Sequence, residues 1–269
     1  MSVLGILTCE ILELEFVHLL KSDKDVKQIT VLQDGKSARL ITKFHSMTAE
    51  NLTLIEDLNL FTPAPDGRFE VLVQVLELAL HSRKKMLQQA LIDAAAALSP
   101  HVDALLLGYG LCGNALEKPD ELLADAGVPI FIPMDEDHPV DDCVGLLIGG
   151  RERYYGEQCN VAGTFFMIPG WTHHWRRMFE QEFGKMSPEI MKEMFKYYER
   201  SLMVTNPTMS LEEMKRNSDE FNAKFGFRTE ICKGTLDILY EIWNKAKSFM
   251  LSKMSSNISV INESNEDQM

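Results

Sequence analysis

Short apolar runs alternate with longer amphipathic segments along most of this chain. Strands that alternate with helices imply a mainly parallel sheet with helices on both faces. We therefore expect an α/β fold built on a mainly parallel sheet flanked by helices. The clearest apolar runs, each the length of one buried strand, are residues 3–8, 29–33, 104–107, 128–134, 163–168 and 202–205.

The strand and helix pattern occurs again in the second half of the chain. This is compatible with two Rossmann-like lobes that share a cleft at the carboxyl ends of their strands. We expect a first lobe over residues 1–160, a second over 161–253 and a disordered polar tail over 254–269. Within the first lobe, residues 69–98 show a strong helical period that ends at Ser99 and Pro100.

The apolar run at 104–107 leads into a glycine-rich loop with polar residues at its tip. Gly108, Gly110 and Gly113 bracket Tyr109 and Cys112. Glycine permits turns and close backbone approach, so we expect Gly108 and Gly110 to let a bound ligand come near the main chain. Loops at the strand ends of open α/β sheets commonly carry the residues that bind ligands or catalyse reactions. The reactive group on this loop is the thiol of Cys112.

Two other cysteines occupy comparable positions. Cys9 directly follows the first predicted strand, and Cys143 stands at the predicted start of a helix. If the three strands are parallel, all three thiols emerge at one edge of the sheet. A helix N-terminus would also lower the pKa of Cys143 and favour its thiolate. We therefore predict a metal site made by Cys9, Cys112 and Cys143.

The donor set has several possible uses. Clustered thiolates bind Zn²⁺ or an iron–sulfur cluster, and three protein ligands leave a fourth position open for a substrate. Zn²⁺ is our first choice because it is the simplest. A redox or nucleophilic thiol, or three ordinary core cysteines, are the alternatives. Cys159 and Cys232 lack the strand-end context, and we interpret them as structural.

Further side chains near these cysteines are candidates for the same site. We expect Asp142 or His138 to donate and accept protons during catalysis. Tyr109 is a further candidate catalytic residue, and both Tyr109 and Asn114 could hydrogen-bond a ligand. The segment 169–175 holds two Trp and two His residues. Its first indole, Trp171, could wall a pocket, or the segment could instead clamp one lobe to the other.

Composition and charge exclude several classes of protein. The net charge of −13 argues against nucleic-acid binding, which needs clustered Lys and Arg. No apolar run approaches the roughly 20 residues of a membrane span, and the first residues lack a basic signal-peptide start. The odd number of five cysteines does not resemble a disulfide framework. We expect a cytoplasmic protein with a small-molecule substrate.

Several motifs occur together in the order found in one known family. They are the segments 107–114, 142–149, 163–171 and 233–235, which include the Gly-Tyr-Gly-Leu-Cys-Gly-Asn loop. The chain resembles the uncharacterised domain-of-unknown-function family sixteen-thirty-eight of methanogenic archaea and anaerobic bacteria, from the first strand to about residue 245. In that family the cysteine at the position of Cys143 typically follows a His-Asp pair, whereas here Asp141 and Asp142 precede Cys143 and His138 lies further upstream.

The resemblance implies a role beside corrinoid-dependent methyltransferase systems, in methanogenesis, methylamine use or related one-carbon metabolism. We expect a metal-thiolate protein, Zn or Fe–S, that activates a small substrate for methyl or group transfer. The alternative is a non-catalytic protein that binds a corrinoid or serves a corrinoid protein or methyltransferase as an accessory. Homo-oligomer formation is compatible with both readings.

Overall fold

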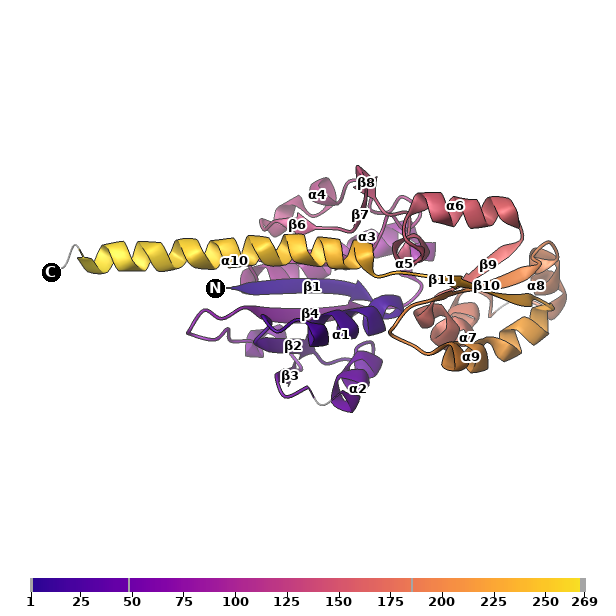
Figure 1. Ribbon diagram of the computed structural model, residues 1–269, viewed down its shortest axis with the longest axis horizontal. Helices are drawn as coiled ribbons and strands as arrows, with labels where there is room; N and C mark the ends of the chain where they lie inside the picture. The colour runs from indigo at the N-terminus through magenta and orange to yellow at the C-terminus, as the bar shows by residue number, and fades with distance from the viewer. Residues whose placement is uncertain (1, 48, 185, 267–269) are drawn as a thin grey trace.

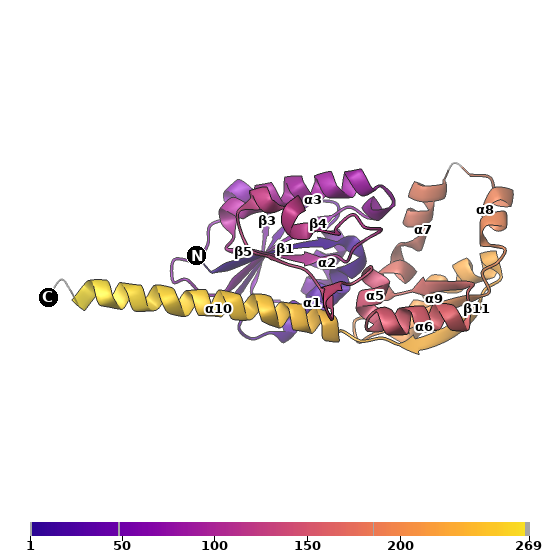
Figure 2. The same cartoon turned by 90° about the horizontal axis from the view of Figure 1, so that it is seen from above.

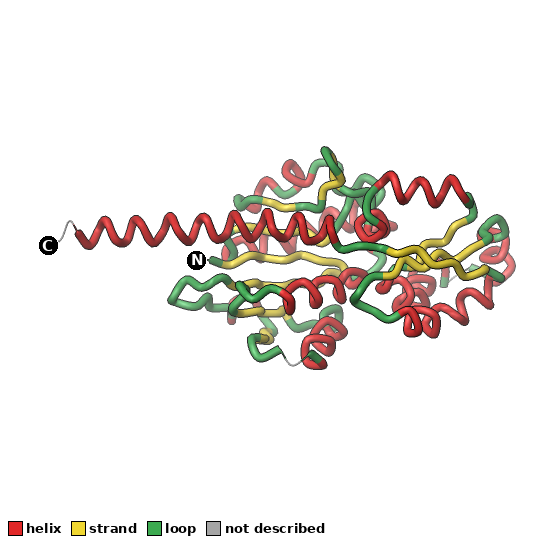
Figure 3. Tube along the Cα trace, viewed as in Figure 1, coloured by secondary structure: helices red, strands yellow, loops and turns green. Residues whose placement is uncertain are grey.

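The computed structural model describes residues 2–47, 49–184 and 186–266. Its strands form two main groups, one in each of two lobes that lie end to end (Figure 1; Figure 3, yellow). Every pairing within these two main sheets is parallel, as the alternation of strands and helices predicts. The mainly parallel α/β architecture is confirmed.

The larger sheet belongs to the first lobe and has the strand order β3-β2-β4-β1-β5-β6. Its central strand, β1, is buried along almost its whole length because helices cover both faces. The six strands are β1 (Val3–Cys9), β2 (Gln28–Leu32), β3 (Leu52–Ile55), β4 (Glu70–Leu76), β5 (Ala104–Gly108) and β6 (Ile130–Phe131).

Helices from both ends of the chain cover the large sheet. One face packs against α1 (Glu13–Ser22), α2 (Ala38–Ser46) and α10 (Asp237–Glu266), and the other against α3 (Lys84–Leu98) and α4 (Pro119–Leu122). Figure 2 shows α3 and α10 on opposite sides of the strands. Short 3-10 turns link these elements: η1 (Glu10–Leu12), η2 (Leu58–Leu60), η3 (Leu80–Ser82), η4 (Ser99–His101) and η5 (Ala124–Ala126).

The second lobe is a three-stranded sheet with the order β11-β10-β9. A core rich in Phe and Met joins one face to α7, α8 and α9, while α5 and α6 lie over the other face. The lobe and its approach comprise the hairpin β7 (Met134–Asp135) and β8 (His138–Pro139), α5 (Cys143–Ile148), α6 (Arg151–Asn160), β9 (Thr164–Met167), α7 (Pro169–Phe183), α8 (Pro188–Phe195), β10 (Arg200–Thr205), α9 (Leu211–Phe225) and β11 (Arg228–Lys233).

The prediction of a helical segment over residues 69–98 is wrong in its first part. Residues Glu70–Leu76 form β4, which pairs with β1 on one side and β2 on the other. A short apolar run fits a buried strand as well as a buried helix, and only the neighbouring strands decide between them. The helix begins later, as α3 at Lys84.

The last helix returns to the first lobe, which the expected boundaries of 161–253 did not foresee. Trp243 of α10 is buried against Phe69, with the ring centroids 6.0 Å apart, and its Nε1 donates to Asp23 Oδ2 at 2.7 Å. Lys247 pairs with the same carboxylate at 2.6 Å. The helix runs to Glu266, where a disordered tail was expected, and its last turns project beyond the first lobe (Figure 1). Residues 267–269 of that tail lie outside the described residues.

The strand order places a topological switch point between β1 and β5. These two strands are neighbours, with Thr8 opposite Gly108 in register. After β1 the chain crosses toward β2 on one side, and after β5 it moves to β6 on the other side. Open α/β sheets bind ligands in the crevice that forms where successive connections diverge in this way.

No helix among the described residues combines the length and the apolar character that a membrane span requires.

We predict that replacing Trp243 with Ala destabilises the first lobe. Removing a fully buried indole leaves a cavity and should lower the free energy of unfolding by about 3–5 kcal/mol. The matched control is Lys245→Ala, which removes only an exposed i,i+4 pair with Glu241 and should change that free energy by less than about 0.5 kcal/mol. Urea unfolding followed by circular dichroism measures both. Equal effects would show that α10 does not stabilise the sheet.

Candidate functional site

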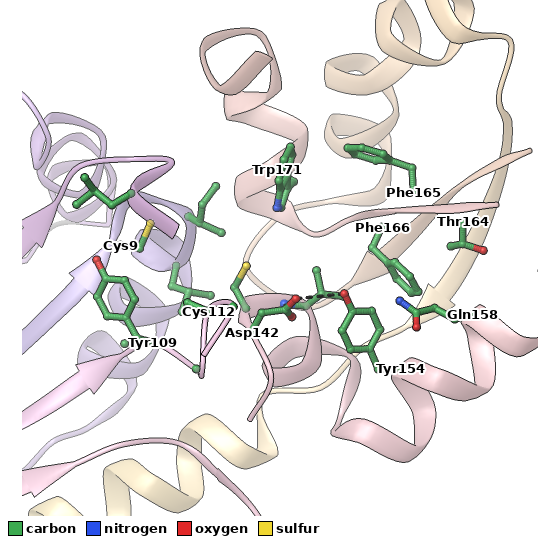
Figure 4. A pocket seen from close by; sticks show the side chains of 18 of the residues that line it. Cys9, Tyr109, Cys112, Asp142, Tyr154, Gln158, Thr164, Phe165, Phe166 and Trp171 are labelled. Carbon is green, nitrogen blue, oxygen red and sulfur yellow. Dashed lines mark hydrogen bonds between the residues drawn. The ribbon is translucent and has the colours of Figure 1, made fainter. Parts of the chain in front are cut away.

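A cavity of about 360 Å³ lies between the two lobes. Its first-lobe wall comes from the carboxyl ends of β1 and β5, and the start of α5 lies at the junction of the two lobes. Its second-lobe wall comes from α6, β9 and the start of α7 (Figure 4). The cavity therefore lies at the switch point of the large sheet, and its size is that of a small-molecule site.

The structure brings Cys9, Cys112 and Cys143 to this one cavity, although they are far apart in the sequence. Cys9 is the last residue of β1, Cys112 lies on the loop after β5, and Cys143 is the first residue of α5. All three side chains are free thiols and are partly accessible. They are near enough for the charges of Cys9 and Cys112 to act on Cys143.

The three thiols are not arranged as a finished metal site. Within the described part of the chain, no three His, Cys, Asp or Glu side chains are grouped closely enough to hold an ion. Thiolate ligands lie about 2.3 Å from a zinc ion, so these sulfurs would have to move closer together to share one.

The loop that carries Cys112 is held rigidly against the segment before α5. The main-chain NH of Leu111 donates to Val140 O at 2.7 Å, and that of Cys112 donates to Asp141 O at 2.9 Å. A Cβ at Gly110 would lie 2.4 Å from Val140 O, so only glycine allows this approach. Cys112 itself has φ of +46°, a left-handed conformation that costs energy for a side chain of this kind.

Enclosure raises the pKa of all three thiols. Burial is the main cause, and it raises the pKa of Cys9 and that of Cys112 to about 12. Burial, then the nearby Asp142 carboxylate, raises the pKa of Cys143 well above its usual value. The prediction that a helix N-terminus lowers the pKa of Cys143 is therefore wrong. These cysteines are protonated at neutral pH unless a cation binds among them.

Asp142 lies in the cavity between Cys143 and Tyr154. Its Oδ1 accepts from the main-chain NH groups of Val144 and Gly145 at 2.8 and 2.9 Å, which caps α5. The hydroxyl of Tyr154, from α6, donates to Oδ2 at 3.1 Å (Figure 4, dashed line). Burial outweighs these bonds and raises the pKa of Asp142. A carboxyl group with a raised pKa is suited to exchanging protons near neutral pH.

Tyr109 lines the cavity beside Cys9, and its hydroxyl end points toward that cysteine (Figure 4). The hydroxyl is buried, and within the described part of the chain its only hydrogen-bonding neighbour is the thiol of Cys9, which is a weak partner. An unsatisfied buried polar atom is uncommon and marks a place where a ligand group would be stabilised. The adjacent Gly108 and Gly110 also line the cavity, so the main chain is accessible there.

Two of the expected site residues lie elsewhere. His138 belongs to the β7–β8 hairpin, contacts Asp137 at 3.2 Å and does not line the cavity. Asn114 has φ of +61° and lines a separate surface hollow near Gln88. Its role is in turning the loop, because Asn tolerates this left-handed conformation.

The second-lobe wall is aromatic. Trp171 hangs over the cavity from the first turn of α7 and meets Phe165 edge to face, with centroids 5.5 Å apart (Figure 4). The rest of the 169–175 segment serves packing. His174 is buried with Nε2 3.0 Å from Glu13 Oε1, and Trp175 donates to Asn217 O at 2.9 Å inside the second lobe. Within this segment Trp171 therefore forms part of the cavity wall, whereas His174 contributes to the contact between the lobes.

Sequence reasoning missed the other aromatic residues of the cavity. Tyr154, Phe165, Phe166 and Tyr198 all line the cavity. Phe165 and Phe166 belong to a predicted strand, but the strand pattern alone does not show that either ring lines a cavity. Tyr154 gave no signal, because its role depends on how α6 lies over Asp142.

Comparison with known families gives one match. A family model described as "Protein of unknown function (DUF1638)" matches residues 75–243, more than half of the chain. The chain therefore belongs to this family. The matched range includes Cys112 and Cys143 but not Cys9, and it is shorter at the N-terminal end than the resemblance predicted from the motifs. Neither the curated proteins nor the solved structures contain a significant match.

We predict that Cys9 and Cys112 resist alkylation at neutral pH. With a pKa of about 12, roughly one thiol in ten thousand is ionised at pH 8, and only the thiolate reacts quickly. Their reaction with iodoacetamide should therefore accelerate about tenfold for each pH unit up to about 11, which peptide mass spectrometry can follow residue by residue. A plateau between pH 8 and 9 would contradict this account of the site.

Proposed function

We propose that this member of the DUF1638 family binds a thiophilic metal ion through Cys9, Cys112 and Cys143 and activates a small substrate for methyl or group transfer. Zn²⁺ is the first choice and an iron–sulfur cluster the alternative. The observation that carries the proposal is the meeting of three free thiols from three separate segments at one cavity.

Electrostatics supports a cation in this place. Three thiolates in one small cavity repel each other and Asp142, so the thiols stay protonated without a positive charge between them. A bound metal ion reverses this balance and deprotonates its thiol ligands outright. The donor chemistry therefore fits a soft metal ion.

The spacing of the thiols requires a local movement before they share an ion. The main chain of Leu111 and Cys112 is fixed by hydrogen bonds, so this movement would come from rotation of the cysteine side chains and from Gly113, which has no neighbour within 4 Å of a Cβ position. When bound, the metal would lower the pKa of a co-substrate thiol in its open coordination position; that thiolate would accept the methyl group, and the demethylated substrate would leave as a neutral molecule. The chain itself would supply Asp142 to exchange protons, Tyr154 to orient it and the Tyr109 hydroxyl to bind the ligand.

The lining of the cavity also indicates the charge of the substrate. Among the lining residues, all of them within the described chain, Glu77 and Asp142 are the ionisable carboxyl groups, and Lys, Arg and His are absent. Aromatic rings form most of the opposite wall. Rings of this kind attract cations through their electron-rich faces, and methylated ammonium groups are recognised in aromatic cages.

We therefore propose an alkylated cation, such as a methylated ammonium or sulfonium compound, as the substrate class. Its alkyl groups would lie against Trp171 and Phe165, and its charge would be offset by Asp142 and Glu77. This agrees with the one-carbon and methylamine role that the family resemblance implies, in which a corrinoid protein or a methyltransferase would be the partner. Five free cysteines suit a reducing compartment, and we propose the cytoplasm.

The cavity volume favours a catalytic site over a corrinoid-binding one. At about 360 Å³ it lies near the lower end of the roughly 300–1,000 Å³ that drug-sized ligands occupy. A corrinoid is much larger than such ligands and would have to spread the two lobes apart. An accessory role in which the protein holds a corrinoid is therefore the less supported alternative.

We predict that anaerobically purified protein binds one Co²⁺, used as a spectroscopic substitute for Zn²⁺, with thiolate charge-transfer absorption in the near ultraviolet. Replacing any one of Cys9, Cys112 or Cys143 with Ser should weaken binding by at least about tenfold, because each removal leaves an incomplete donor set. The matched controls are Cys159→Ser and Cys232→Ser, which should bind Co²⁺ normally. Absorption retained in all three site variants would contradict the proposal.

The same titration has a predicted pH dependence. Because the thiols are protonated in the absence of metal, binding must release up to three protons. Lowering the pH by one unit should therefore weaken binding by about tenfold for each proton released, up to about a thousandfold. Affinity that stays constant between pH 6 and 8 would show that these thiols are not the ligands.

We also predict that the cavity prefers a cation to neutral or anionic molecules of the same shape. Tetramethylammonium should quench or shift the Trp fluorescence at lower concentration than tert-butanol, and pivalate should have no effect. Trp171→Leu should abolish the response, whereas the buried Trp243 should contribute a constant background in both proteins. Equal responses to the three probes would contradict the proposed substrate class.

A further inference from the structure

Three glutamates lie within the six residues that follow Cys9, and all three are buried. Glu10, Glu13 and Glu15 are each at most 3% exposed, which is unusual for carboxylates unless they are paired. They lie on η1 and the first turn of α1, where the first lobe faces the second. Each of them contacts the second lobe.

Two of these contacts lie deep in the lobe interface. Glu13 pairs with His174 of α7 at 3.0 Å and also with Arg39 of the first lobe at 2.6 Å. Glu15 accepts from Asn206 Nδ2 at 2.8 Å and from the hydroxyl of Thr208 at 3.1 Å, both located just after β10. These bonds fix α1 against the second lobe along one side of the cleft.

The third contact is different because its partner is half exposed. Glu10 Oε1 accepts from the main-chain NH of Leu78 at 2.9 Å, which ties it to the end of β4, and Oε2 forms an ion pair with Arg177 of α7. The Glu10 side chain is 4% exposed and that of Arg177 is 45% exposed. The pair can therefore open without unfolding either lobe.

The same helix carries Trp171 over the cavity. The first turn of α7 lies against η1, and a Cβ at Gly170 would be only 2.0 Å from Ile11 O, so the two backbones touch. The chain thus connects Cys9 to Glu10, Glu10 to Arg177, and Arg177 through α7 back to Trp171. The Glu10–Arg177 pair therefore links the segment that carries Cys9 to the helix that carries Trp171.

We propose that the Glu10–Arg177 pair is a latch that holds the cleft closed and thereby positions Cys9 against Trp171. Glu10 and Arg177 are positioning residues in this account, because they act through their neighbours and do not line the cavity themselves. The proposal takes the location of the ligand site from the proposed function, but it requires neither the metal nor the substrate to be correct. It concerns the accessibility of Cys9 in the protein alone.

The test is the rate at which iodoacetamide alkylates Cys9 in the native, unliganded chain, measured by peptide mass spectrometry at pH 9. Arg177→Gln should increase this rate about five- to tenfold, because an opened cleft returns the thiol to water. Arg177→Lys keeps the charge and should restore the rate to within about twofold of the original. Cys232, on β11 away from the cleft, is the internal reference and should not change.

The matched control is Arg176→Gln on the same helix. Arg176 pairs with Glu220 of α9 inside the second lobe, and both side chains are more than half exposed, so the Cys9 rate should not change. A Glu10→Gln variant opens the latch from the other side, and combining it with Arg177→Gln should add no further acceleration. This second variant keeps the proposal testable if the first one fails to fold.

Two results would overturn the proposal. One is an unchanged Cys9 rate in both Arg177→Gln and Glu10→Gln. The other is an equal acceleration at Cys9 and Cys232, which would indicate a general loss of stability. Failure of metal or cation binding would leave the Cys9 rates unaffected, so it would count against the proposed function and not against the latch.

Discussion

The side-by-side pairing of β1 and β5 is the constraint on which the site depends. Because the two strands are parallel and neighbours, their carboxyl ends deliver Cys9 and the Cys112 loop to the same place. The chain leaves these ends in opposite directions, and a crevice opens between them. The second lobe then covers that crevice with an aromatic wall, which leaves the thiols only partly accessible to water.

Enclosure has a chemical consequence that links the fold to the proposed function. Neutral thiols are tolerated in a partly apolar cavity, whereas a group of thiolates there would be strongly disfavoured. The raised pKa values of Cys9 and Cys112 are the expression of this balance. Protonated thiols react little on their own, and in the proposed function it is a bound cation that changes their state.

Much of the fold could be predicted from the sequence because most of its strands are short apolar runs, and several of these end at Gly, Pro or Asn. The segment Glu70–Leu76 could not, since an apolar run of that length suits a helix and a buried strand equally. The return of α10 to the first lobe was also hidden. The position of α10 depends on the packing of Trp243 against Phe69, two residues that are far apart in the chain.

The candidate site was predictable where a residue's position follows from a strand end, and not where it follows from packing between lobes. The placement of Cys9 and Cys112 needed only parallel strands. The role of Tyr154 could not be predicted, because it depends on how α6 is oriented over Asp142. The direction of the Cys143 pKa shift could not be predicted either, because it depends on how far the second lobe buries this thiol. The burial of Glu10, Glu13 and Glu15 also could not be predicted, because it depends on the second lobe covering them.

The most direct test of the central claim is whether one trivalent arsenic atom, which bonds to as many as three thiols without any redox step, bridges the three cysteines. We expect arsenite to add one arsenic per chain in native mass spectrometry and to protect Cys9, Cys112 and Cys143 together from later alkylation. Cys159 should remain open to the reagent. Independent protection of single cysteines, or no stable adduct at all, would show that the three sulfurs do not share one site.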